Sequence, residues 1–217
     1  MKYNSWIVLG PVRTGSLVIA NKLFFSAPEL RYRAPDISPR AINNPELIHS
    51  HDLNWLNYAA DDTGVVISIR NPIESALSWC ILPKFGQTDG AVNYHFFNHT
   101  IKKFEELQNN IEPFDLNIDK FLEAFSLVNM FYSQIEVKDH YYIMDYANWS
   151  SDTTKILNQL DIAEPRTVPI LTKTSVPVPL KNPGSHKQWI RNWEELMKVS
   201  ETLSLEKYTQ LCQRKHW

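Results

Sequence analysis

A short apolar run that leads straight into a glycine-bracketed turn is the feature that most constrains this chain. Trp6 to Leu9 is rich in strand-forming residues, and Gly10 and Gly15 enclose the four residues that follow. The same spacing occurs in the phosphate-binding pattern G-x-x-x-x-G-K-[ST], in which a strand, a tight turn and a helix follow one another. The sequence therefore predicts a strand, loop and helix that hold a phosphate at the first turn of the helix.

The loop lacks the lysine that reaches the β- and γ-phosphates of a nucleoside triphosphate, because Ser16 and Leu17 follow Gly15. The cation in the loop is Arg13 instead. Backbone N–H groups at the helix start, the hydroxyl groups of Thr14 and Ser16, and the charge of Arg13 predict a phosphate site that does not handle a triphosphate. An ordinary strand-to-helix turn is the alternative for this segment by itself.

A second strand-like run, over 65–70, ends in Arg70 and passes directly into another helical pattern. Asn71 suits the N-cap, Pro72 the first helical position and Glu74 a capping-box-like arrangement. Arg70 would then lie at the carboxyl end of a strand, where ligands of parallel sheets bind. Nucleotide kinases often place a magnesium-binding carboxylate there, so a guanidinium predicts that arginine, and no metal, neutralises phosphate charge. A surface arginine paired with Glu74 is the alternative.

Strand-like runs alternate with segments of helical spacing along much of the chain. The strand-like runs span roughly 5–10, 47–51, 65–70 and 141–146, and the helical patterns include 16–25 and 118–135. This alternation predicts an α/β fold of the P-loop type, with three layers and a central, mainly parallel sheet of about four to five strands flanked by helices. The length of 217 residues and the 43% hydrophobic content fit one domain over 1–217.

Charge and cysteine content exclude several classes of protein. With 22 Lys+Arg against 24 Asp+Glu, the net charge of -2 argues against a broad nucleic-acid-binding surface. Cys80 and Cys212 give neither a disulfide framework nor metal-ligand spacing, which predicts a reducing, cytoplasmic location.

No run approaches the ~20 apolar residues of a membrane span. The apolar run near the N-terminus is too short for a signal peptide and is followed by Pro11 and Arg13.

Together the two motifs resemble those of the sulfotransferases that use 3′-phosphoadenosine-5′-phosphosulfate (PAPS). In that family the first loop has the form P-[KR]-[ST]-G-[ST]-[ST]. Residues 11–17 read PVRTGSL, with one extra residue after the proline and with Leu17 in place of a hydroxyl residue. The family's second motif is a strand that ends in R-[ND]-P, with a serine eight residues beyond the arginine, and it is matched by RNP at 70–72 and by Ser78.

The resemblance implies a role for each matched residue in holding the nucleotide. Arg70 and Ser78 would bind the 3′-phosphate. Tyr146 begins the run YANWSSD, which is similar to the family's Y-E-D-L-x-x-D segment and would place this tyrosine near the adenine. The loop residues that would hold the 5′-phosphosulfate are Arg13, Thr14, Gly15, Ser16 and Leu17.

Two histidines occupy the place where the family carries its catalytic base. Residues 48–53 read IHSHDL, about twenty residues before Arg70, where members have a Lys-Thr-His-like stretch. A histidine titrates near neutral pH, so it can accept a proton from an attacking hydroxyl or amine. His51 is the favoured base and His49 the second candidate, while Arg13 would stabilise the departing phosphate. A buried structural histidine is the alternative for each.

The C-terminal part of the chain offers one further candidate segment. The family's R-K-G-x-x-G loop, which closes over the 3′-phosphate, is matched best by the basic stretch over 181–187. Lys181, Gly184 and Lys187 would then contact the nucleotide. A solvated basic loop is the alternative.

The resemblance implies transfer of the sulfuryl group from PAPS to a hydroxyl or amine, with release of 3′,5′-adenosine bisphosphate (PAP) and without a metal. The acceptor, whether a small molecule, a glycan, a lipid or a peptide, and the oligomeric state do not follow from the sequence. A P-loop kinase or nucleotide hydrolase is one alternative, although it needs a loop lysine and a Mg²⁺ carboxylate. A non-catalytic nucleotide-binding module is the other, and Leu17 favours it.

Overall fold

The computed structural model describes residues 3–27, 29–33, 38–42, 45–81, 112–160 and 186–214. These residues form a five-stranded sheet in the order β2-β3-β1-β4-β5, and every pair of neighbouring strands is parallel. The predicted α/β fold with a mainly parallel sheet is therefore confirmed. The strands are β1 (Ser5–Leu9), β2 (Arg31–Arg33), β3 (Glu46–Ser50), β4 (Thr63–Ile69) and β5 (Tyr141–Asp145).

Four of the five strands coincide with the predicted apolar runs to within two residues at each end. Strand β2 has no counterpart among those runs. It is only three residues long, reads Arg-Tyr-Arg, and lies at the edge of the sheet, where Tyr32 pairs with Leu47 of β3. Because an edge strand of this kind buries little apolar surface, its sequence carries no strand-like period.

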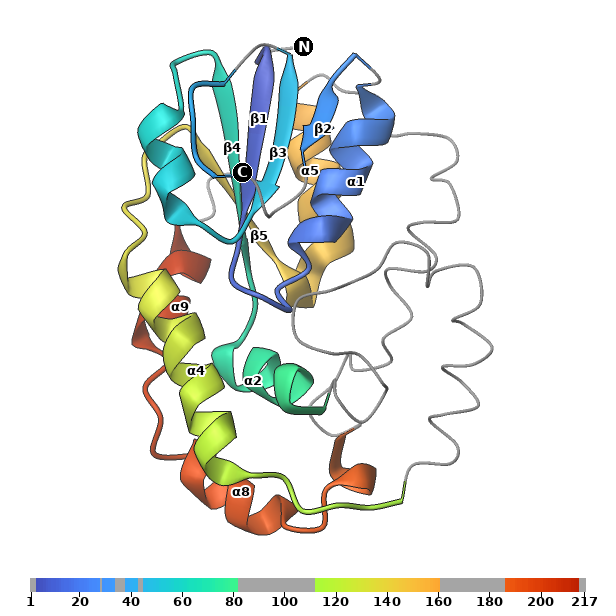
Figure 1. Cartoon of the computed structure of the whole chain (residues 1–217), viewed down its shortest axis with the longest axis vertical. Helices are drawn as coiled ribbons and strands as arrows, with labels where there is room; N and C mark the ends of the chain where they lie inside the picture. Colours follow the sequence, from blue (N-terminus) through green and yellow to red (C-terminus); the bar gives the residue numbers. More distant parts are fainter. Residues whose placement is uncertain are drawn as a thin grey trace.

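Helices cover both faces of the sheet, which gives the predicted three layers (Figure 1). Successive side chains of β1 alternate between the two faces: Trp6 and Val8 pack with α1 and α5, and Ile7 and Leu9 pack on the opposite side with α4 and α9. All five residues of β1 are buried, as expected for a central parallel strand. The helices are α1 (Ser16–Ser26), α5 (Trp149–Gln159), α4 (Ile118–Ser133) and α9 (Glu206–Gln213).

A third apolar cluster lies beyond the carboxyl edge of the sheet and fixes α2 (Pro72–Ile81). Helix α2 begins where β4 ends (Figure 1). Leu77 and Ile81 of α2 are fully buried there, together with Phe121 of α4 and Leu196. This packing holds α2 across the end of the sheet. The remaining elements include α8 (Trp193–Ser200) and the short 3₁₀ helices η1 (Leu53–Tyr58), η4 (Tyr146–Asn148) and η5 (Lys187–Trp189).

Strand β1 lies at the centre of the sheet. Strands β2 and β3 lie on one side of it, and β4 and β5 lie on the other. Leu9, the last residue of β1, is in register with Ser50 of β3 and with Ile67 of β4. Strand β4 continues two residues beyond this register, to Ile69, and the segments that leave the three strands all start at the same edge of the sheet. Such a change of direction in strand order opens a crevice at the carboxyl ends of the strands, which is where open α/β sheets bind ligands.

None of the helices in the described residues is both long enough and apolar enough to cross a bilayer. Cys80 and Cys212 are both free thiols.

Candidate functional site

The loop after β1 is shaped by two glycines at which a larger residue would collide with neighbouring atoms. A Cβ at Gly10 would lie 2.6 Å from Thr14 Oγ1 and 2.7 Å from the carbonyl oxygen of Ser68 in β4. Gly15 has a φ of +83°, in the left-handed region that favours glycine, and its Cα faces the ring of Tyr146 so closely that a Cβ would overlap the ring. The loop is thus pressed against β4 on one side and against the end of β5 on the other.

Thr14 stabilises the loop through two hydrogen bonds. Its side chain is fully buried, and its hydroxyl donates to the Pro11 carbonyl at 2.7 Å. Its own carbonyl accepts a hydrogen bond from the Ser68 hydroxyl at 2.7 Å. The donor predicted for a phosphate is therefore used inside the loop in this arrangement, and a contact between Thr14 and a ligand stays a prediction. Leu17 is half-buried in the first turn of α1.

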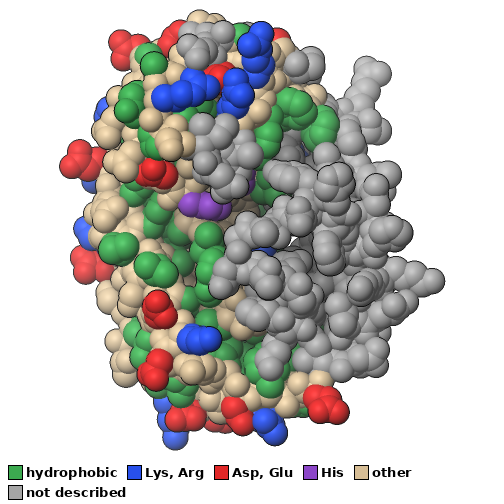
Figure 2. Space-filling model, in the orientation of Figure 1, with side chains coloured by type: hydrophobic (Ala, Val, Ile, Leu, Met, Phe, Trp, Pro, Cys, Tyr) green, Lys and Arg blue, Asp and Glu red, His purple; other side chains and the backbone are tan. Residues whose placement is uncertain are grey.

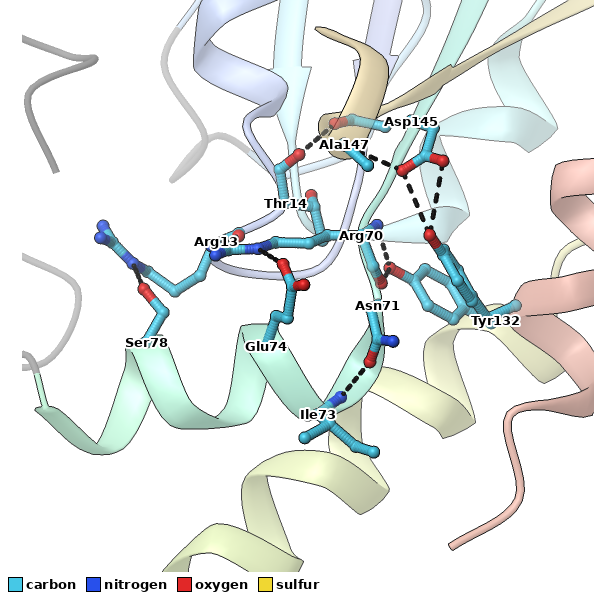
Figure 3. Close-up of polar contacts among 12 residues, drawn as sticks. Arg13, Thr14, Arg70, Asn71, Ile73, Glu74, Ser78, Tyr132, Asp145 and Ala147 are labelled. Carbon is cyan, nitrogen blue, oxygen red and sulfur yellow. Dashed lines mark hydrogen bonds and ion pairs between the residues drawn. The ribbon is translucent and has the colours of Figure 1, made fainter. Parts of the chain in front are cut away.

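Arg13 reaches from the loop to helix α2. Its φ of +67° is unusual for a residue with a side chain and costs roughly 1 kcal/mol, a type of strain that is concentrated at functional sites. Its Nε donates to the Ser78 hydroxyl at 3.1 Å (Figure 3). Burial, and then the nearby charge of Arg70, lower the pKa of Arg13 to about 10, so this guanidinium keeps its charge at neutral pH.

Arg70 lies next to Arg13 and is only 3% exposed. Its Nε donates to Glu74 at 3.2 Å (Figure 3). Its Nη1 donates to the Arg13 carbonyl at 3.3 Å, and its guanidinium lies 4.6 Å from the centre of the Tyr146 ring. The pairing with Glu74 named as an alternative is present, but Arg70 is a buried residue and not a surface one. Glu74 serves this arginine, whereas Asn71 caps α2 as predicted and accepts from the Ile73 N–H at 2.9 Å.

Tyr132 of α4, which was not among the predicted site residues, fixes the end of β4. The Tyr132 hydroxyl accepts from the Arg70 N–H at 2.9 Å and donates to the Arg70 carbonyl at 2.8 Å. Burial raises the pKa of Tyr132 far above its ordinary value. Its ring stacks on Tyr208, whose hydroxyl donates to Asp145 at 3.3 Å, just before Tyr146. Helices α4 and α9 thereby hold both strand ends that carry Arg70 and Tyr146.

The two histidines lie at the carboxyl end of β3 in different settings. His51 is exposed, and its Nδ1 lies 2.6 Å from the Gly10 carbonyl oxygen. Because a carbonyl can only accept, Nδ1 carries the proton, and in the neutral ring Nε2 keeps its lone pair. His49 is buried, with Nε2 2.8 Å from the Ser16 hydroxyl and Nδ1 3.1 Å from the Tyr32 hydroxyl. Burial, and then His51, lower the pKa of His49 to about 3.

The structure brings together most of the residues predicted for the site. The loop, Arg70, Ser78 and Tyr146 are joined by the contacts above, and His51 touches the loop at Gly10. Lys187 is 61% exposed and pairs with Glu194 of α8 at 3.1 Å, which fits the solvated alternative named for its segment. Lys181 and Gly184 lie outside the described residues.

Positive charge gathers inside this site. On the face drawn in Figure 2, basic side chains group at the top around an acidic one, and elsewhere acidic and basic side chains of the described residues are interspersed. In the site, by contrast, two guanidiniums lie beside a glycine loop at the start of α1, and among the polar contacts given above one carboxylate, that of Glu74, binds them directly. This arrangement can bind an anion with more than one negative group.

Comparisons with known proteins add little to this picture. No protein-family model and no curated protein sequence matches the chain significantly. Among solved structures, the chain is similar to a sulfotransferase from Alicyclobacillus acidocaldarius, with 13% sequence identity and a TM-score of 0.38, over 96% of this chain and 99% of the other. A similarity at this level carries no functional argument, so the function has to be argued from the residues of the site.

Proposed function

We propose that the protein is a sulfotransferase that moves the sulfuryl group of PAPS to a hydroxyl or amine and releases PAP. The observation that carries this proposal is the junction of two anion-binding segments. Arg13 of the first loop donates to Ser78 of α2, and Arg70 donates to the Arg13 carbonyl. A ligand that binds there meets two fixed positive charges from separate strand ends. PAPS, with phosphate groups at both its 5′ and 3′ positions, has the matching distribution of charge.

The nucleotide would be held by different groups at its two ends. The 5′-phosphosulfate would lie at the start of α1, where backbone N–H groups, Ser16 and Arg13 meet. The 3′-phosphate would lie against Arg70 and Ser78. The adenine would lie near Tyr146, whose ring already contacts Gly15 and Arg70. Whether Lys181 and Gly184 close over the 3′-phosphate stays a prediction.

The chemical step would rest on charge stabilisation and one proton transfer. By analogy with phosphoryl transfer, the acceptor oxygen or nitrogen forms a bond to sulfur while the bond from sulfur to the bridging oxygen breaks. The electron pair of that bond leaves with the 5′-phosphate of PAP, and Arg13 would stabilise the developing charge. The acceptor proton would pass to Nε2 of His51, the nitrogen left with a lone pair by the hydrogen bond from Nδ1–H to Gly10.

The acceptor class is the open part of this proposal, and a small molecule is the simplest choice. A glycan, lipid or peptide acceptor fits the same chemistry, and nothing in the charge balance favours nucleic acid. The two free thiols accord with a cytoplasmic location, which remains a prediction. A nucleotide-binding module without transferase activity is the second candidate, because Leu17 stands where a further hydroxyl contact would be made.

The direct test is formation of PAP from PAPS. The purified chain is incubated with PAPS alone and with pooled alcohols, amines, sugars and phenols, and PAP is measured by chromatography. We expect PAP to form in at least one pool, and to form at least tenfold more slowly with Arg13→Ala. Tight binding of PAP with no transfer to any pool would favour the binding module. Phosphate release from ATP with Mg²⁺ would favour the hydrolase.

A further inference from the structure

A chain of three uncharged side chains runs from the edge of the sheet into the start of α1. The Tyr32 hydroxyl, on β2, lies 3.1 Å from Nδ1 of His49, on β3. Nε2 of the same ring lies 2.8 Å from the hydroxyl of Ser16, the first residue of α1. His49 and Ser16 are both about 95% buried. Both nitrogens of the His49 ring are therefore hydrogen-bonded. The series of hydrogen bonds ends at the N-terminus of α1, where the 5′-phosphosulfate is proposed to bind.

A neutral imidazole has one N–H and one lone pair, so its two neighbours must play opposite roles. In one tautomer Nδ1 accepts from Tyr32 and Nε2–H donates to Ser16. The Ser16 oxygen then acts as acceptor, and its own O–H is left to donate to a ligand. In the other tautomer the Ser16 O–H donates its hydrogen bond to Nε2. Ser16 then has no O–H for a phosphate, and Ser16 and His49 form a nucleophile-and-base pair.

The surroundings favour the first tautomer. A phenol, with an ordinary pKa of about 10, is a stronger hydrogen-bond donor than a serine hydroxyl, so Tyr32 is the better donor of the two. The positive end of the α1 dipole and the charge of Arg13 attract an anion, towards which a serine hydroxyl can donate but not accept. The depressed pKa of His49 agrees with a ring that stays neutral at physiological pH.

We propose that His49 is a positioning residue: acting between Tyr32 and Ser16, it turns the Ser16 hydroxyl into a fixed donor for the 5′-phosphosulfate, while proton transfer from the acceptor belongs to His51. This inference rests on the proposed function. It assigns different roles to His49 and His51, which lie two residues apart in the sequence and whose ring centres are 5.5 Å apart. It also explains why a buried, doubly hydrogen-bonded histidine stands beside a phosphate loop without serving as a base.

The test is a double-mutant cycle on two ligands. PAP carries both phosphates, and adenosine 3′-phosphate lacks the 5′ group that Ser16 would contact. Ser16→Ala is expected to weaken PAP roughly tenfold, the usual effect of losing a hydrogen bond to a charged group. His49→Phe is expected to weaken PAP by a similar factor, and Tyr32→Phe by about threefold. Adenosine 3′-phosphate should change less than about twofold throughout.

The effects of Ser16→Ala and His49→Phe on PAP affinity should not add. In the Ser16→Ala background, His49→Phe should cause little further loss of PAP affinity, because its effect passes through the hydroxyl already removed. His49→Gln, whose amide reaches about as far as Nε2 and can donate there, should recover part of the affinity. Independent losses that multiply, or equal losses for both nucleotides, would overturn the inference.

A spectroscopic measurement reads the tautomer of His49 in the wild-type chain itself. Nitrogen-15 NMR of the histidine-labelled wild-type chain, with the His49 signals identified by their absence in His49→Gln, reports which ring nitrogen carries the proton. Protonated Nε2 is the expected result, and protonated Nδ1 would overturn the inference. Failure of the proposed function is a separate outcome, since wild-type protein would then fail to bind PAP, or would bind it and transfer no sulfuryl group from PAPS to any acceptor. The inference alone fails if PAP binds and Nδ1 is protonated.

Discussion

The two sides of the site are stabilised by different kinds of contact. One side lies around β1 and β3, and the other is formed by the ends of β4 and β5. Around β1 and β3 the contacts described above are hydrogen bonds: Tyr32, His49 and Ser16 form one series, and His51 bonds to the Gly10 carbonyl. At the ends of β4 and β5 the contacts involve charge, since Arg70 pairs with Glu74 and lies over the Tyr146 ring.

This difference in contacts indicates that the two sides of the crevice have different roles. Under the proposed function, the hydrogen bonds on the β1–β3 side would orient the Ser16 hydroxyl and His51. The guanidinium of Arg70, held by a carboxylate, a carbonyl and a ring, supplies charge at a fixed place, so under the proposed function the β4–β5 side would hold phosphate. Arg13 links the two, because it belongs to the loop and donates to Ser78 of α2.

The largest expected effect concerns catalysis on the β1–β3 side. His51→Ala should lower kcat by about 10²–10⁴-fold, the usual contribution of a general base, and should leave PAP affinity within about twofold. Measurement of kcat and of PAP binding by calorimetry checks both parts. His140→Ala, at an exposed histidine away from the site, is the control. Equal loss of turnover and of PAP affinity would place His51 in binding or in folding.

The next effect concerns charge on the β4–β5 side. Arg70→Ala should weaken PAP about a hundredfold, because charge-assisted contacts to a phosphate are lost. Adenosine 5′-phosphosulfate, which has no 3′-phosphate, should weaken far less. Arg31→Ala, at an exposed arginine of β2, should change neither affinity. If both nucleotides weaken alike after Arg70→Ala, this arginine does not bind the 3′-phosphate.

The junction between the two sides is tested by Gly15→Ala. The new methyl group would need a positive φ and would overlap the Tyr146 ring, so we expect a loss of about 2–3 kcal/mol in the free energy of unfolding. Urea denaturation measures it. Tyr146→Leu combined with Gly15→Ala should recover the part caused by overlap and leave the backbone cost. A fully stable Gly15→Ala variant would show that the loop does not press against Tyr146.

A smaller effect is the response of stability to acid. With a pKa of about 3 in the folded chain and about 6.5 in the unfolded chain, His49 binds a proton only on unfolding between these values. Its contribution to stability is therefore full above about pH 6.5 and falls as the pH drops towards 3, by about 2 kcal/mol at pH 5. Unfolding at pH 7 and pH 5 should show this loss in the wild type and not in His49→Gln. Identical pH slopes would mean that His49 is not buried as a neutral ring.

The parts of the site that follow from the sequence are those encoded by short, local patterns. The glycine spacing, the cation of the loop and the arginine that ends a β-branched run each lie within a few residues of the strand that positions them. Gly15, Arg13 and Arg70 could therefore be assigned to one end of the sheet before the fold was known. Their neighbourhood follows from the parallel strand order.

The rest depends on contacts between residues far apart in the chain. The hydroxyl of Tyr132 meets Arg70 across 62 positions, and that of Ser16 meets His49 across 33. Neither tyrosine nor serine carries a local signal for such a partner. The inward turn of the Thr14 hydroxyl is likewise a matter of packing, because it depends on how closely the loop approaches β4.

The most direct test of the sulfotransferase proposal is a calorimetric titration of the wild-type chain with PAP, compared with ATP in the presence of Mg²⁺. Saturable binding of PAP at micromolar concentration, with much weaker binding of ATP and no dependence on Mg²⁺, is the predicted result. Absence of PAP binding at millimolar concentration, or tight binding of ATP that requires Mg²⁺, would contradict it.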